Sequence, residues 1–190
     1  MTVRLLGALA LVAVLALIAV GRSTGDGGAP RASSPCGPVE RAPRELGLDR
    51  TRELTLCLLN AERGKRSLAP LRREARLELA SQRHSEDMVT RRFFDHDSPG
   101  GADPQARMLA AGYASGNAFT GENIAWATGP AASPAEIVRL WMNSPPHRRD
   151  ILQLGFVEIG VGVAPGAPRA PRSKDPPYTY TTDFGGPPLR

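Results

Sequence analysis

The chain has little of several residue types that usually mark a functional site. Its 190 residues include two cysteines and three histidines. No further cysteine supports a metal role for the pair Cys36 and Cys57, and no HExxH spacing joins the histidines. Local spacing alone therefore does not establish a zinc site.

Lysine is also scarce, so arginine carries almost all of the basic charge. The formal net charge is +5, and lysine occurs only at Lys65 and Lys174. No basic run is interleaved with aromatic residues, and the arginines between 40 and 92 are scattered among acids. This pattern predicts a solvated mixed surface and argues against a nucleic-acid partner.

One long apolar run stands at the beginning of the chain. It extends from Leu5 to Val20 after a single early cation, Arg4, and small residues follow at 19–21. These features predict a signal peptide over 1–21 and an extracellular or cell-envelope location. The alternative is an uncleaved N-terminal anchor, which is the one route by which we expect membrane association.

The two cysteines fit an oxidising compartment. In an exported chain, Cys36 and Cys57 favour a disulfide, which would tie the N-terminal segment to the first helix. Residues 22–50 are rich in Gly, Pro, Ser and Arg, a composition typical of a disordered linker. A single folded domain is then expected over 51–187.

Hydrophobic periodicity predicts helices followed by a small sheet that helices interrupt. Helices are expected over 52–63, 75–91 and 105–111, and another should begin at Ser133-Pro134 and stop at the SPP of 144–146. Strands are expected over 122–127, 156–163 and 178–184. This order predicts an α+β or layered α/β/α domain.

Three histidines and one glutamate are the candidates for chemistry. His84 lies on the buried side of a predicted helix, where a packed histidine with one hydrogen bond is the simpler interpretation. His96 lies in a polar turn-rich loop, and His147 follows two prolines at the expected start of a helix. Glu122 opens a buried strand, where a carboxylate needs Arg, His or a metal as a partner.

Five ordered motifs resemble the CAP superfamily of cysteine-rich secretory, antigen 5 and pathogenesis-related proteins, and within it the bacterial exported SCP-like branch. They are HSEDM (84–88), FFDHDSPGG (93–101), GENIAW (121–126), WMNSPPHRRDIL (141–152) and FVEIGVGV (156–163). The resemblance implies a three-layer α-β-α sandwich around a central antiparallel sheet.

The resemblance also implies an open cleft that some family members use to bind zinc. Carried over motif by motif, the cleft residues are His96, Glu122 and His147. The position three residues after the tryptophan, an acid in the full family set, is Ser144 here. His96 and His147 are the tentative metal ligands, and with Glu122 they would suffice for zinc with an open position.

Two functions remain open, beside a third, purely structural interpretation in which the cleft is a relic in a disulfide-tethered domain. The first is an extracellular binding or interaction module for a lipid, sterol, glycan or protein partner, with Tyr113, Phe119 and Trp126 as candidates for a groove wall. The second is a cell-envelope hydrolase, either zinc-dependent or using Ser98 or Ser144 with a histidine base. No nucleophile elbow supports the second, so whether the protein is an enzyme stays open at this point.

Overall fold

The computed structural model describes residues 34–113 and 118–187. In chain order, the elements are α1 (Pro43–Leu46), α2 (Leu48–Gly64), β1 (Arg72–Arg73), α3 (Ala75–Arg91), α4 (Pro104–Ala110), β2 (Phe119–Thr128), a 3-10 turn η1 (Gly129–Ala132), α5 (Pro134–Asn143), α6 (Pro145–Ile151), β3 (Glu158–Pro165) and β4 (Pro177–Gly186).

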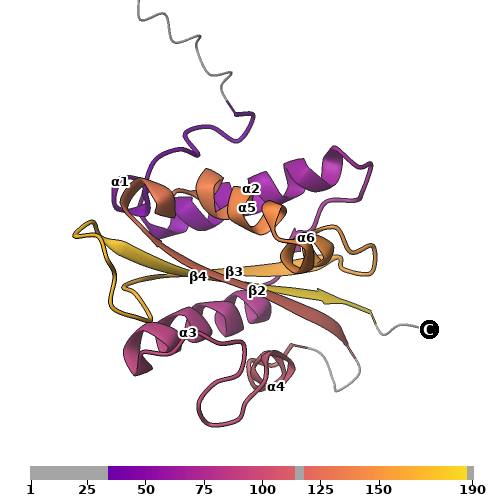
Figure 1. The fold of residues 1–190 in the computed structure, drawn as a ribbon. Coiled ribbons are helices and arrows are strands. Elements are labelled where there is room, and N and C mark those ends of the chain that lie inside the picture. The colour runs from indigo at the N-terminus through magenta and orange to yellow at the C-terminus, as the bar shows by residue number, and fades with distance from the viewer. Residues whose placement is uncertain (1–33, 114–117, 188–190) are drawn as a thin grey trace, which may run out of the picture. The chain divides into compact units, whose positions relative to one another are not determined.

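The strands form one sheet in the order β1-β3-β4-β2. Helices α2, α5 and α6 cover one face and α3 and α4 the other, which confirms the three-layer α+β fold (Figure 1). β4 pairs antiparallel with both β2 and β3, as expected. The sheet as a whole is mixed, because β1 joins its edge parallel to β3 through Arg72 and Arg73. A two-residue strand has no periodicity from which it could be predicted.

The face under α2, α5 and α6 holds the main apolar core. Alternate residues of β3 and β4 point into it, among them Ile159, Val163, Tyr180 and Phe184, and all four are buried. Trp141 of α5 is fully buried there, and its indole N–H donates to the carbonyl of Ile124 at 3.1 Å. This contact fixes α5 over the central part of β2.

The face under α3 lies very close to its helix and combines polar contacts with a small apolar cluster around Leu77 and Met108. A Cβ at Gly160 would lie 2.0 Å from the Leu77 carbonyl carbon, and one at Gly162 would lie 2.3 Å from backbone atoms of Ser81. Glycine on β3 therefore lets the α3 backbone rest directly on the sheet. At this interface Ser85 donates a hydrogen bond to Thr181 at 2.9 Å between the two hydroxyl oxygens.

A buried arginine holds the chain between α6 and β3 in place. Arg63, near the end of α2, is 2% exposed, and its guanidinium donates to the carbonyls of Ala69, Ile151, Gln153 and Phe156 at 2.8 to 3.2 Å. Because three of those carbonyls lie at the end of α6 and on the approach to β3, Arg63 sets the position of α6 relative to the sheet.

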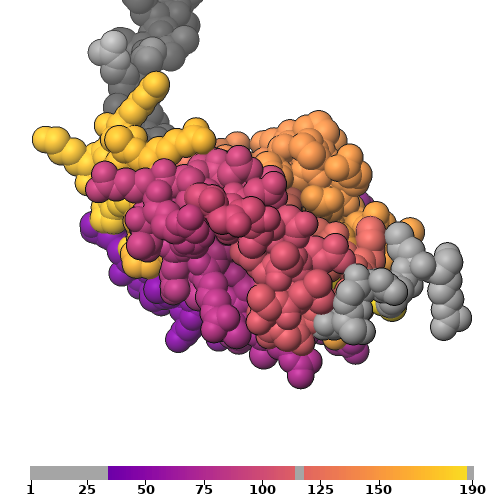
Figure 2. All heavy atoms as spheres, turned by 90° about the horizontal axis from the view of Figure 1, so that it is seen from below, coloured from indigo at the N-terminus to yellow at the C-terminus, as the bar shows by residue number. Residues whose placement is uncertain are grey.

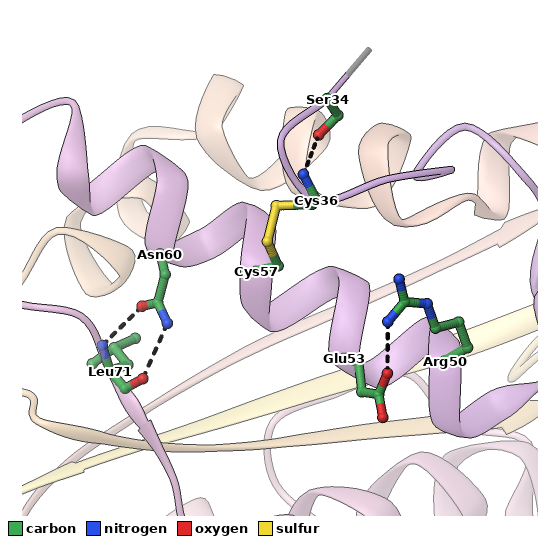
Figure 3. Close-up of a disulfide and its surroundings, with 7 residues drawn as sticks. All are labelled: Ser34, Cys36, Arg50, Glu53, Cys57, Asn60 and Leu71. Atoms are coloured by element: carbon green, nitrogen blue, oxygen red, sulfur yellow. Dashed lines mark hydrogen bonds and ion pairs between the residues drawn. A yellow bond between two sulfur atoms is a disulfide. The ribbon is translucent and has the colours of Figure 1, made fainter.

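The predicted disulfide between Cys36 and Cys57 is present and ties the segment before α1 to α2 (Figure 3). The linker expected over 22–50 extends too far, however. From Ser34 onward the chain contains α1 and the start of α2, and Val39 is only 3% exposed. Apolar contacts with α2, not composition, order this segment. The leader expected over 1–21 lies outside the described residues.

Candidate functional site: a buried carboxylate between His96 and Arg107

The loop after α3 and the helix α4 are joined by one arginine. Asp103 caps α4 by accepting a hydrogen bond from the Ala106 N–H at 2.7 Å, and Pro104 fits the first turn. Arg107 then extends from α4 and donates to the carbonyls of His96 and Ala102 at 2.7 and 2.9 Å. The loop that carries His96 is thereby closed onto α4.

Glu122 of β2 lies at the centre of the site, with its side chain 1% exposed. One carboxylate oxygen, Oε2, accepts from Arg107 Nη2 at 2.6 Å. The other, Oε1, accepts from His96 Nδ1 at 2.7 Å, so Nδ1 carries the proton. The sequence predicts that this buried carboxylate needs Arg, His or a metal as a partner. The structure provides both an arginine and a histidine, and each of them donates to one carboxylate oxygen.

The pKa values of the two histidines near Glu122, His96 and His84, shift in opposite directions. The hydrogen bond from His96 to Glu122 raises the pKa of His96 above 6.5, against the effect of burial and of Arg107. Burial lowers the pKa of His84, although its Nε2 lies 3.9 Å from Glu122 Oε1. His84 Nε2–H donates to the Asp95 carbonyl at 3.1 Å, the single hydrogen bond expected for it.

A second buried acid lies directly opposite Glu122. Asp183 of β4 is its partner in the antiparallel register and is 1% exposed. Neither of its carboxyl oxygens has a hydrogen-bond partner among the described residues. Burial, and then the neighbouring Glu122 carboxylate, raise the pKa of Asp183 well above 3.8. This shift favours the neutral, protonated form of Asp183 beside Glu122.

His147 reaches the same region from the opposite layer. α5 ends at Asn143, Ser144 has an extended backbone, and α6 begins at Pro145, so His147 lies in the first turn of a new helix, as predicted. Its carbonyl accepts from the side-chain amide of Asn123 on β2 at 3.1 Å. Burial, and then the charge of nearby His96, lower the pKa of His147.

Asp150 of α6 is a further acid on this side. A Cβ at Gly121 would lie 3.8 Å from its carboxyl carbon, which places Asp150 beside β2. Burial raises the pKa of Asp150, and the charges of Arg149 and His96 lower it. Ser144 is the N-cap residue of α6, but its side chain makes no capping hydrogen bond.

An open hollow of about 370 Å³ lies over this network. It is lined by seven residues, five of which have polar or charged side chains: His96, Asp103, Pro104, Gln105, Thr120, Gly121 and Glu122. His147 and Ser144 are not among these residues, and neither are the suggested wall residues Tyr113, Phe119 and Trp126. Tyr113 instead donates to Glu158 at 3.0 Å, and Phe119 stacks on Phe156 with ring centroids 4.6 Å apart.

The side chains present do not match the needs of a zinc ion. Among residues 34–113 and 118–187, no three His, Cys, Asp or Glu side chains form a group that could hold a metal. Glu122, the acid of the expected set, already has Arg107 on one oxygen and the His96 N–H on the other. A metal bound there would displace a guanidinium from a buried carboxylate, so the arrangement fits a charge-paired network better than a ligand set.

Sequence reasoning missed Arg107, Asp183 and Asp150. Arg107 is one of many arginines, and no spacing joins it to Glu122. Asp183 could have been noticed as an acid within the alternating strand YTYTTDF, but only the register with β2 shows that it faces Glu122. All three are brought to the site by tertiary structure.

A model of the CAP family, described as the cysteine-rich secretory protein family, matches residues 56–171. An uncharacterised protein of Bacillus subtilis, YkwD, is 41% identical over 105 residues, which cover 55% of this chain and 39% of that protein. The chain thus matches well under half the length of this relative.

Solved structures show the same fold. An extracellular protein containing an SCP domain from Bacillus anthracis aligns with a TM-score of 0.55 and 25% identity, over 73% of this chain and 40% of that one. An outer surface protein of Borrelia burgdorferi aligns with a TM-score of 0.57 and 18% identity, over 71% and 91% of the two chains. Within the described part of this chain, no helix is long and apolar enough to cross a membrane.

Proposed function

The chain belongs to the CAP, or cysteine-rich secretory protein, family, and from that premise we propose that it is an exported binding domain that holds a glycan in the hollow beside His96. On this proposal the domain acts at the cell envelope without a metal and without hydrolysing its ligand. The observation that carries it is the Glu122 carboxylate, whose two oxygens are occupied by Arg107 and His96.

The types of side chain around the hollow favour a glycan over a lipid or sterol. They include the imidazole of His96, an amide, a hydroxyl and the Asp103 carboxylate, and they include no large apolar or aromatic side chain. Sites for lipids and sterols are lined mainly by apolar and aromatic side chains, with few polar groups. Sugar hydroxyls, in contrast, can both donate to and accept from groups such as the Thr120 hydroxyl and the half-exposed imidazole of His96.

The geometry gives no comparable support to a hydrolase. A serine nucleophile needs a histidine within hydrogen-bond reach, and the described residues show no such bond from Ser98 or Ser144. Glu122 accepts the Nδ1–H of His96 and so orients that imidazole, but among the described residues no serine hydroxyl bonds to the other ring nitrogen. The network is therefore suited to holding the loop around His96 in one position.

Three observations support an extracellular setting. The disulfide between Cys36 and Cys57 is typical of oxidising compartments. Two structurally similar proteins are described as an extracellular and an outer surface protein. The N-terminal apolar run fits export. A protein partner at the same hollow is the main competing use of the domain.

Calorimetric titration with soluble cell-wall tetrasaccharides would test the proposal, with sterol and fatty-acid vesicles as the comparison. We expect saturable tetrasaccharide binding. His96→Ala should weaken the affinity about tenfold, because it removes one hydrogen bond of the kind made by a charged group. Asp97→Ala, a change at an exposed neighbour outside the lining, should leave binding unchanged. Binding of vesicles alone would overturn the glycan assignment, and release of cleaved sugar would favour a hydrolase.

A further inference from the structure

A second hollow lies at the C-terminal end of α3, where the loop that carries His96 begins, and it shares no lining residue with the hollow beside His96. It measures about 310 Å³ and is lined by Arg92, Ala167, Arg169, Ala170, Pro171 and Pro177. These residues come from the end of α3 and from the loop that joins β3 to β4. Figure 2 views the face covered by α3 and α4 and shows the yellow end of that loop beside the magenta helix.

The loop is held against α3 by contacts at its base. The Gly166 N–H donates to the Pro177 carbonyl, and the Thr179 hydroxyl donates to the Gly166 carbonyl, both at 2.9 Å. Gly166 has φ +120°, and a Cβ there would lie 2.4 Å from a methyl carbon of Val89 on α3. The close approach and the backbone conformation both require glycine, so the walls of the hollow are formed in advance of any ligand.

Two guanidinium groups line this hollow without a carboxylate partner. Arg169 donates to the Phe94 carbonyl at 3.3 Å and lies over the Phe94 ring, 5.8 Å from its centroid. Arg92 ends α3 in a left-handed conformation, with φ 58°. Within the described part of the chain neither forms an ion pair. Each retains donors that could serve a ligand.

Two acids in the segments that flank the hollow are engaged with other side chains. Asp87 pairs with Arg91 at 3.4 Å, and Asp175 accepts from the Ser173 hydroxyl at 2.9 Å. Two further cations of the loop, Arg172 and Lys174, are exposed. This end of the domain therefore has an excess of positive charge around a preformed concave surface.

We propose that this hollow is a phosphate-binding site, in which Arg92 and Arg169 hold the phosphate group of an anionic cell-envelope ligand. Guanidinium groups match phosphate oxygens with paired N–H donors, and the small, rigid lining of alanine and proline leaves room for a compact anion. A membrane surface fits less well, because none of the exposed large apolar side chains, Leu79, Leu109, Leu140, Leu154 and Val157, belongs to this loop. The site is separate from the glycan hollow and does not depend on it.

The test is a titration of the purified full chain with inorganic pyrophosphate, followed by NMR of the arginine side-chain N–H groups and by calorimetry. Arg92→Gln/Arg169→Gln should weaken binding at least tenfold. The control, Arg76→Gln/Arg149→Gln, makes the same charge change at two other exposed arginines. Arg76 lies near the start of α3, about 24 Å along the helix from Arg92. The control should stay within about twofold, since distant exposed charges are screened.

Three outcomes would overturn the proposal. Equal weakening in the two double variants would show that net charge, not this hollow, binds the anion. Equal affinity for citrate would show that the site does not select phosphate. Binding to anionic phospholipid vesicles with no response to pyrophosphate would identify a membrane surface instead. Arg92→Lys/Arg169→Lys keeps the charge but not the planar guanidinium groups. Full affinity in that variant would show that charge alone, and not guanidinium geometry, binds the anion.

Discussion

Replacing Arg107 by methionine tests whether the Glu122 network holds the candidate site together. The substitution keeps an unbranched apolar stem and removes the guanidinium. It deletes the 2.6 Å ion pair with Glu122 and the hydrogen bonds to the His96 and Ala102 carbonyls. Glu122, whose side chain is 1% exposed, would keep only the His96 N–H as a close partner.

The expected loss of stability is large for a single substitution. Breaking a buried ion pair by removing one partner costs about 3–5 kcal/mol, and we take about 3 kcal/mol because the Arg107 side chain is still 11% exposed. For a domain of this size that corresponds to a fall in Tm of about 6–12 °C. The matched control is Arg50→Met, which breaks the exposed pair with Glu53 (Figure 3). An exposed pair is worth about 0–1 kcal/mol, so the control should move Tm by no more than about 4 °C.

The same variant makes a prediction about pH. The charge of Arg107 lowers the pKa of His96, so Arg107→Met should raise that pKa further. Protonation of His96 contributes stability that is fully present below pH 6.5 and is lost as the pH rises through the raised pKa. The variant should therefore retain this contribution to higher pH than the parent. NMR titration of the histidine ring protons, with thermal unfolding recorded at each pH, measures both effects.

Equal falls in Tm for Arg107→Met and Arg50→Met would refute the reasoning, as would a fall in the His96 pKa. If Arg107→Met does not fold, Arg107→Lys keeps the charge and allows the same comparison. A double-mutant cycle with Glu122→Gln then isolates the pair. We expect coupling between positions 107 and 122, and additive effects would show that the two side chains act independently.

Three further predictions concern the scaffold. Arg63→Met should lower the free energy of unfolding by at least about 3 kcal/mol in denaturant titrations, because it leaves buried carbonyls without donors; a loss under about 1 kcal/mol would contradict this. Gly160→Ala should lower the free energy of unfolding by about 1–3 kcal/mol, because the added Cβ would lie 2.0 Å from the α3 backbone. In the control, Gly100→Ala, the added Cβ would have no atom within 4 Å, so the free energy of unfolding should not fall in this way. Replacing Cys36 and Cys57 by serine opens a loop with a sequence separation of 21 and should cost about 3 kcal/mol, and an unchanged Tm would mean that packing alone holds this segment.

The parts of the fold that the sequence predicts are those with a local cause. Helical spacing over 75–91 corresponds to α3, and alternation over 178–184 lies within β4. The SPP of 144–146 separates α5 from α6, because Ser144 takes an extended backbone and the prolines fit only the first turn of a new helix. Each of these elements can be derived from a short window of residues.

The parts that the sequence does not predict depend on pairing between distant segments. Strand β1 is only two residues long and exists because Arg72 and Arg73 lie beside β3. Residues 34–47 resemble a linker in composition, yet Val39 is buried in contacts with the region around α2. The Glu122 site is similar: the spacing of Glu122, Arg107 and Asp183 along the chain carries no periodic signal, and sheet register and loop closure bring them together.

The two faces of the sheet differ in what they bury. One face packs Ile159, Tyr180 and Phe184 into the largest apolar cluster of the described residues, which contributes hydrophobic stabilisation. On the other face, two buried acids, Asp183 and Glu122, lie opposite each other, and apolar side chains of similar volume would often be more stable there. Stability alone therefore does not explain the polar face. Because the buried network reaches His96, in the wall of the hollow, its role under the proposed function is to hold that imidazole in a fixed position for the ligand.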